Sequence, residues 1–276
     1  MDGRSRLRVL GSAPAVLILV AAVVGCASDP AARPAPDPEE VLRQAQARMA
    51  KKKYYSAREM LNSIVHHPTA SPQTLAEVQL LLADAYFFDK GFLNLTEAQG
   101  RYQAFLSFHP RHEKVDYAQY QLAMCYFLQV LDPERDQEQT RKAIEEFRKL
   151  ETLYPASPYI PPARQRISEC FNRVAEHGFR IGWYYLRRRT PQAALARFHA
   201  LIEEFPDYSG REKLYFHIAL AYRRVSQPDR AREFLDRLLR DFPEGEYAGP
   251  ARRMQEKLEE PGEAPVSAAE SGAAPA

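Results

Sequence analysis

The chain has 276 residues, of which 45% are hydrophobic, and its 38 Lys and Arg nearly balance 36 Asp and Glu to give a formal net charge of +2. This balance argues against a nucleic-acid-binding protein, because a phosphate-binding surface needs net positive charge or a clustered basic patch. The length suffices for one or two ordinary domains or for an array of repeats. With only 12 Gly and no convincing alternating strand pattern, the sequence favours helices.

The first 25 residues have the pattern of a signal peptide. Three Arg residues within the first eight positions precede an apolar run over 9–24, and Gly25 and Cys26 follow directly. The run is shorter than the roughly 20 residues of a comfortable membrane span. Residues 23–26 also resemble the lipobox of bacterial lipoproteins, in which the Cys is acylated. We therefore expect Cys26 to carry the lipid, the alternative being an ordinary secretory signal with a stray Cys.

The segment after Cys26 is predicted to be a lipidated, flexible tether over 26–38. It holds four Pro and only Ala as further apolar residues, so it cannot bury a core. Ala27 stands where, in well-studied Gram-negative species, Asp would favour inner-membrane retention. This resemblance implies an outer-membrane protein that faces the periplasm. At the other end, residues 261–276 are rich in Ala, Gly, Pro, Ser and Glu and are expected to be disordered.

A repeated pattern organises the rest of the chain. An Ala is followed after four residues by a large residue, after three more by another, and after five more by a Pro that ends the helix. The copies are Ala98, Tyr102, Phe105 and Pro110; Ala143, Phe147, Leu150 and Pro155; Ala194, Phe198, Leu201 and Pro206; and Ala231, Leu235, Leu238 and Pro243. A weaker copy comprises Ala57, Leu61, Ile64 and Pro68.

Another predicted helix precedes each copy, and it carries a small residue and a Tyr three positions apart, as in Ala83 and Tyr86. Such a two-helix unit is the tetratricopeptide (TPR) pattern. We predict an all-α, right-handed α-solenoid of about five TPR helix pairs within 39–260. The predicted units are roughly 39–70, 72–112, 114–159, 162–208 and 210–258.

The unit spacing departs from the simple 34-residue TPR repeat. The closing prolines are all more than 34 residues apart, and two insertions account for most of the excess. Residues 131–140 lengthen the turn of the third unit, and the run 162–189 predicts one long helix joining the third unit to the fourth.

The titratable residues and motifs of the chain favour a protein that is not an enzyme and has no metal or cofactor. His66, His67, His109 and His112 fall in turns without the further ligands that zinc needs. The sequence has no GxSxG, Gly-rich phosphate loop or CxxC motif. Cys125 and Cys170 lie in apolar helical stretches and are expected to be buried thiols, although an oxidising periplasm would permit a bridge.

A peptide-binding groove is the better functional prospect. Solenoids bind ligands on the side lined by the first helix of each unit. The substrate-groove candidates there are Phe87, Phe88, Tyr117, Tyr120 and Phe127, with Phe179, Trp183 and Phe216 in later units. For any single aromatic residue a core position is the alternative. Together they favour a groove for extended or aromatic-ended peptide segments.

The third and fourth units also resemble a known family. The specific residues are Arg135, Asp136 and Gln137, then Thr140, Arg141, Lys142, Ala143, Ile144 and Phe147, then Tyr154, Pro155, Ser157, Pro158, Tyr159 and Ala163. Ile181, Gly182, Tyr184, Tyr185, Arg197, Phe205, Pro206 and Asp207 extend the agreement. The pattern resembles the BamD family, TPR lipoproteins of the machinery that folds β-barrel proteins into the bacterial outer membrane. The resemblance covers the lipobox and nearly all of 39–258.

The resemblance implies a non-enzymatic scaffold and substrate receptor. The N-terminal units would bind unfolded outer-membrane protein segments, and the C-terminal units would dock on a POTRA domain of the barrel-forming subunit. Arg197 corresponds to a family Arg that takes part in docking, and Arg187 and Arg188 are further docking candidates. An ordinary solvated helix face is the alternative for all three. A second hypothesis is a TPR lipoprotein that recruits peptidoglycan hydrolases or cell-envelope division factors.

Overall fold

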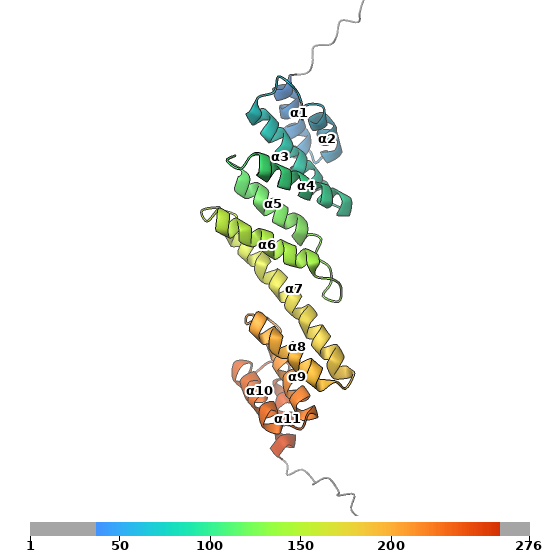
Figure 1. Cartoon of the computed structure of the whole chain (residues 1–276), viewed down its shortest axis with the longest axis vertical. Helices are drawn as coiled ribbons and strands as arrows, with labels where there is room; N and C mark the ends of the chain where they lie inside the picture. Colours follow the sequence, from blue (N-terminus) through green and yellow to red (C-terminus); the bar gives the residue numbers. More distant parts are fainter. Residues whose placement is uncertain (1–36, 260–276) are drawn as a thin grey trace, which may run out of the picture. The chain divides into compact units, whose positions relative to one another are not determined.

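The computed structural model describes residues 37–259, which form eleven α-helices and no strand (Figure 1). This confirms the predicted all-α array. Cys26, the signal segment, most of the tether and the tail lie outside the described residues. Within them, no helix has both the length and the apolar character needed to cross a membrane.

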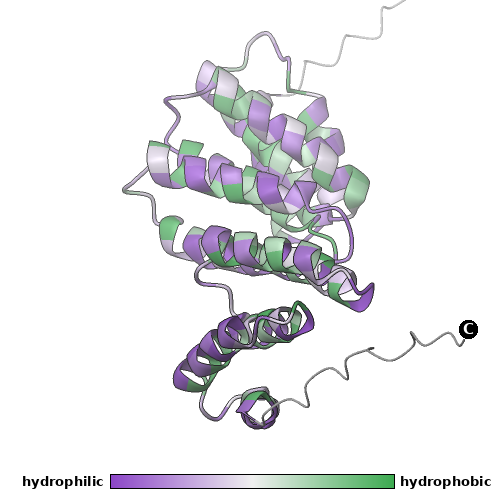
Figure 2. Ribbon diagram, turned by 60° about the horizontal axis from the view of Figure 1, so that its bottom comes forward, coloured by the Kyte–Doolittle hydropathy of each residue, from purple (hydrophilic) through white to green (hydrophobic). Residues whose placement is uncertain are grey.

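The helices follow one another in pairs, and each helix packs against the next in the chain. The first helix of each pair is α1 (Pro38–Ala50), α3 (Pro72–Asp89), α5 (Val115–Phe127), α7 (Ile160–Arg187) and α9 (Arg211–Arg224). The second is α2 (Tyr54–Asn62), α4 (Phe92–Phe108), α6 (Glu138–Leu153), α8 (Pro191–Glu204) and α10 (Pro228–Asp241), and α11 (Ala248–Glu259) covers the last pair. Polar and apolar residues mix along the helices, as amphipathic packing requires (Figure 2).

The repeated motif residues form the contacts between paired helices. The motif alanines and the large residues four positions later are fully buried, as in Ala98 and Tyr102 or Ala194 and Phe198. A small residue lets the partner helix approach, and the large side chain fills the space one turn further on. Gly182 serves the same purpose on α7, because a Cβ there would overlap the ring of Phe198.

The predicted long helix is confirmed as α7, which has 28 residues and extends about 42 Å. It packs against α6 before it and α8 after it, so a single helix belongs to the cores of the third and fourth pairs. The lengthened turn of the third pair occupies 128–137, since α5 ends at Phe127 and α6 begins at Glu138. Residues 138–140, expected in that insertion, instead form the first turn of α6.

Candidate functional site

A cleft of about 310 Å³ opens among the first helices of the N-terminal pairs. Its walls come from α1, α3, the start of α5 and the residue that precedes α7. These are the elements that the TPR pattern assigns to the ligand-binding side. The lining residues are Gln46, Glu77, Leu80, Leu81, Asp84, Lys114, Tyr117 and Tyr159.

Asp84 is a partly buried carboxyl group of this cleft with a strongly shifted pKa. Its Oδ1 accepts hydrogen bonds from the hydroxyls of Tyr102 at 2.5 Å and Tyr117 at 2.9 Å. Burial raises the pKa of Asp84 to about 6, although the two hydroxyls and the ammonium of Lys114 pull it down. Burial and the nearby carboxylate raise the pKa of both tyrosines, which therefore remain donors at neutral pH. The cleft thus contains one carboxyl group that titrates just below neutral pH.

A row of partly buried aromatic rings continues from the cleft. Tyr159 lies with its ring centroid 5.8 Å from that of Tyr117 and 5.1 Å from that of Tyr120, on which it stacks. Tyr120 and Phe127 both contact Phe147 of the core, with centroids 5.8 and 6.5 Å away. Three of the predicted groove residues are therefore brought together, each packed on one side and partly open to solvent.

The other predicted groove aromatics are not part of this row. Phe87 is only 7% exposed and packs with Tyr102, so the structure corrects its assignment from groove wall to core. Phe88 is 38% exposed and stacks on Tyr54 at the end of α3, and neither of these two phenylalanines lines the cleft. Phe179 is likewise a core residue, stacked on Phe198. Of the other two aromatics predicted in the later units, Trp183 is exposed and Phe216 packs partly against Tyr247.

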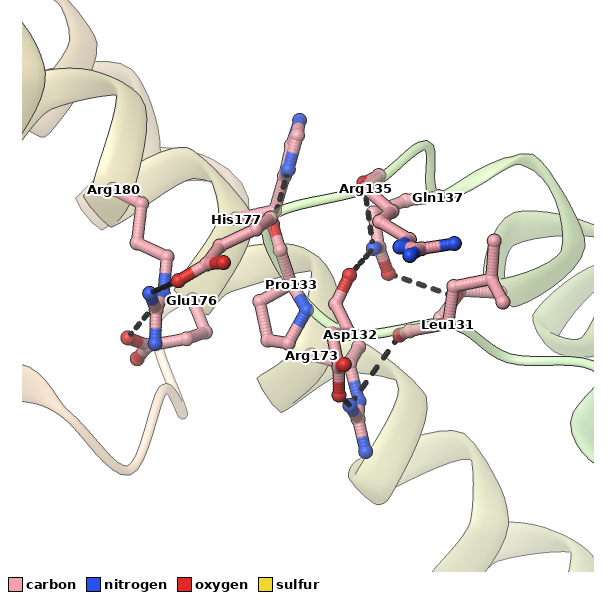
Figure 3. Close-up of polar contacts among 11 residues, drawn as sticks. Leu131, Asp132, Pro133, Arg135, Gln137, Arg173, Glu176, His177 and Arg180 are labelled. Carbon is pink, nitrogen blue, oxygen red and sulfur yellow. Dashed lines mark hydrogen bonds and ion pairs between the residues drawn. The ribbon is translucent and has the colours of Figure 1, made fainter.

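The turn between α5 and α6 is fastened to α7 by polar side chains (Figure 3). Nη1 of Arg173 donates to the carbonyl of Leu131 at 3.3 Å, and Nδ1 of His177 donates to the carbonyl of Pro133 at 2.6 Å. Arg180 forms an ion pair with Glu134. Because Arg173, His177 and Arg180 are spaced by four and three residues, they share one face of the helix.

Gln137 holds the same turn from within. It is buried, and its Nε2 donates to the carbonyls of Asp132 at 3.0 Å and Arg135 at 2.9 Å. Its Oε1 accepts from the hydroxyl of Thr140 at 2.8 Å. The block of residues that carries the family resemblance therefore has a structural role in shaping this turn.

The docking candidates lie on the C-terminal pairs and are exposed. Arg187 lies over the ring of Trp183 at 4.7 Å, and Arg188 lies over that of Tyr184 at 5.5 Å. Arg187 also lines a cleft of about 390 Å³, with Arg189, Pro191 and Arg224. Arg197 is on α8, outside that cleft, and makes no ion pair with any described residue. The structure thus places Arg187 at this cleft, Arg188 over a different exposed ring and Arg197 on the next helix.

Cys125 and Cys170 lack the features of reactive cysteines. Cys125 and Cys170 are buried and unbridged, and burial raises the pKa of Cys170 to about 12 and that of Cys125 further. Reactive cysteines are instead exposed and have lowered pKa values. Among residues 37–259, no group of three or more His, Cys, Asp or Glu is placed to hold a metal ion.

Three residues that line the cleft, Asp84, Lys114 and Tyr159, were not predicted as site residues. Asp84 interrupts an apolar stretch of α3, and a lone carboxylate at such a place is the signal that points to it. Tyr159 belongs to the family-like block but precedes α7 instead of lying within a first helix. Its ring reaches the cleft because the chain turns there.

Comparisons with known proteins agree with one another. The sequence profile of the YfiO family, described as outer membrane lipoprotein, matches residues 34–234, which are 201 of the 276 residues. The chain is 32% identical over 136 residues to the outer membrane protein assembly factor BamD of Caulobacter vibrioides, covering 49% of this chain and 45% of that one. This match spans less than half of the Caulobacter protein.

Two further relatives are matched over most of their length. They are the outer membrane protein assembly factors BamD of Vibrio cholerae and Rickettsia prowazekii. The first is 27% identical over 208 residues, covering 71% of this chain and 84% of the relative. The second is 26% identical over 210 residues, covering 74% and 80%.

Proposed function

The chain belongs to the YfiO family of outer membrane lipoproteins, and we propose that it is a non-enzymatic scaffold and substrate receptor in the assembly of β-barrel proteins into the bacterial outer membrane. Its curated relatives carry the name of outer membrane protein assembly factors. The observation that carries the proposal is the cleft on the first helices of the N-terminal pairs, with partly exposed aromatic rings beside it.

The cleft suits an extended, unfolded segment of a barrel protein. Strands of such proteins alternate apolar and polar residues and carry aromatic girdles. Leu80, Leu81 and Tyr159 offer apolar and aromatic contacts in the cleft, whereas Lys114 offers a cation to a carboxylate. Both tyrosine hydroxyls donate to Oδ1 of Asp84, so its Oδ2 is the carboxylate oxygen left to accept from a ligand. We therefore assign substrate binding to Tyr117, Tyr120 and Phe127 together with the cleft.

The C-terminal pairs are proposed to dock on a POTRA domain of the barrel-forming subunit. Arg187, Arg188 and Arg197 are exposed there, and arginine is the side chain that best pairs with carboxylates across an interface. The fastening of the α5–α6 turn to α7 supports a stiff link between the third and fourth pairs. A stiff link would hold a bound substrate segment at a fixed position relative to the docking end.

The lipid on Cys26 is proposed to hold the array at the periplasmic side of the outer membrane. Affinity purification of the tagged lipoprotein from detergent-solubilised membranes tests the whole proposal. We expect the barrel-forming subunit with its POTRA domains to be recovered with it. Recovery of peptidoglycan hydrolases or division factors without that subunit would overturn the proposal in favour of the alternative function.

A further inference from the structure

The turns α1–α2 and α3–α4 expose an unusual group of apolar side chains. Leu93 is 80% exposed, the highest value among the large hydrophobic side chains of the described residues, and Phe92 is 70% exposed. Tyr55 is 66% exposed and Phe88 is 38% exposed. We call this surface the tip patch, and its members are Lys51, Lys52, Lys53, Tyr54, Tyr55, Phe88, Lys90, Phe92 and Leu93.

Contacts between α2 and the α3–α4 turn make the tip patch one continuous surface. The ring of Tyr54 stacks on that of Phe88 with centroids 6.2 Å apart. Arg58 forms an ion pair with Asp89 at 2.9 Å, and its Nη1 donates to Oδ1 of Asn94 at 3.3 Å. The two turns are therefore held side by side.

The backbone of the second turn directs Phe92 and Leu93 outward. Lys90 and Gly91 have consecutive positive φ angles of 60° and 82°, so the chain reverses within two residues and α4 begins at Phe92. The first side chain of α4 to enter the core is Leu95, which is 6% exposed. A non-glycine residue with positive φ costs about 1 kcal/mol or more. Lys90 is held in this conformation although the two residues after Gly91 contribute little to the core.

Lysines surround these apolar side chains. Lys51, Lys52, Lys53 and Lys90 are all exposed, and the carboxylate of Asp89, next to Lys90 in the chain, is bound by Arg58 and by the amide of Asn94. Glu59 is also exposed, one turn further along α2. On the side of the α5–α6 turn, Lys90 and Phe92 also line a cleft with Asp136 and Glu138, and these two carboxylates bound the basic surface there.

We propose that the tip patch binds the lipid surface of a membrane containing anionic phospholipids. Phe92 and Leu93 enter the boundary between headgroups and acyl chains, and the lysines reach the phosphates while their methylene stems cover apolar surface. This rests on the proposed function only in that the lipid anchor keeps a membrane within reach. From Cys26 to Asp37 the chain can extend at most about 36–40 Å. That exceeds the length of α1, about 20 Å, which separates Asp37 from the tip.

Fluorescence of a single Trp tests the proposal on the chain from residue 26 on, with Cys26→Ser to remove acylation. Trp183→Phe removes the one native Trp, and Phe92→Trp then reports from the tip patch. The matched control is Phe108→Trp, at the opposite end of the same helix and 74% exposed. With vesicles of phosphatidylcholine and phosphatidylglycerol, Phe92→Trp should shift to the blue and be quenched by brominated acyl chains. Phe108→Trp should do neither.

Equal behaviour of the two Trp variants would overturn the proposal. Independently, Phe92→Ser with Leu93→Ser should lower co-sedimentation with the same vesicles about tenfold, as should Lys51→Glu with Lys53→Glu. Unchanged sedimentation of both variants would also overturn it. Absence of vesicle binding, together with cross-linking of an unfolded barrel peptide to position 92, would overturn the proposal too, because the patch would then bind protein. None of these results depends on recovery of the barrel-forming subunit with the lipidated chain.

Discussion

Nδ1 of His177, in the middle of α7, donates a hydrogen bond to the carbonyl oxygen of Pro133, 2.6 Å away and 44 residues earlier in the chain. Arg173 and Arg180, about one turn to either side, hold the same turn at Leu131 and Glu134. The α5–α6 turn has no regular secondary structure of its own. Its conformation therefore depends on the helix that joins the third and fourth pairs.

Loss of the His177 imidazole should loosen this turn. We expect His177→Ala to lower the free energy of unfolding by about 1 kcal/mol, the contribution of one hydrogen bond of this kind. Amide hydrogen exchange should accelerate at residues 131–137 by more than elsewhere. His66→Ala is the matched control, because His66 is exposed and lies in another turn. Equal exchange of 131–137 in the two variants would show that the contact does not order the turn.

Asp84→Asn should change how stability depends on pH. The folded carboxyl keeps its proton up to a pKa of about 6, whereas the unfolded chain releases it near 3.8. The free energy of unfolding of the unaltered protein therefore falls as pH rises between these values, by up to about 3 kcal/mol. Asn cannot titrate, and its carbonyl still accepts from Tyr102 and Tyr117.

Urea unfolding at pH 4, 5, 6 and 7.5 measures this effect as a difference between the two proteins. The Asp84→Asn variant should gain stability relative to the unaltered chain as pH rises, and the gain should level off above pH 7. Other titrating groups are common to both and cancel. A difference that stays constant with pH would mean that the carboxyl of Asp84 has an ordinary pKa.

Two glycines within helices should respond in opposite ways to Ala. In Gly182→Ala the new Cβ would overlap the ring of Phe198, so we expect a loss of about 1–3 kcal/mol. In Gly100→Ala nothing lies within 4 Å of the new Cβ, and helix propensity should add up to about 1 kcal/mol. Thermal unfolding of both variants checks the pair. Similar melting temperatures would contradict the close approach of α7 and α8.

Arg197→Glu should weaken recovery of the POTRA-bearing subunit without unfolding the helices. Arg197 makes no ion pair with the described residues, so reversing its charge breaks no described ion pair. The control is Arg111→Glu, which makes the same charge change at an exposed position in the N-terminal half. Recovery and helical circular dichroism should be measured for both. Equal recovery would assign Arg197 to the solvated surface.

The helix pairs and the long helix could be predicted because their signals are local. Ala, aromatic residue and Pro recur at helical spacing, and α7 runs from Ile160 to Arg187 with Pro only in its first turn. Which aromatics are core could not be predicted, since Phe87 and Phe88 are neighbours that differ only in direction: one faces Tyr102 and the other Tyr54.

The cleft was beyond prediction for a related reason. The two hydroxyls that bind Asp84 come from residues 18 and 33 positions later in the chain. No local sequence pattern predicts how the helices that carry them pack. Tyr159 reaches the cleft from outside a first helix. Contacts of this kind follow from how pairs stack, and a single sequence records only each pair's own periodicity.

Photo-cross-linking from the cleft tests substrate reception most directly. Benzoylphenylalanine replaces Leu81, which lines the cleft, or Leu153, which is 60% exposed on α6 outside it. The probe is a labelled peptide ending in the final strand of a barrel protein, with a scrambled peptide as control. We expect cross-linking from position 81 that excess unlabelled peptide abolishes, and little from position 153. Equal cross-linking from both positions, or no preference over the scrambled peptide, would contradict a substrate receptor at this cleft.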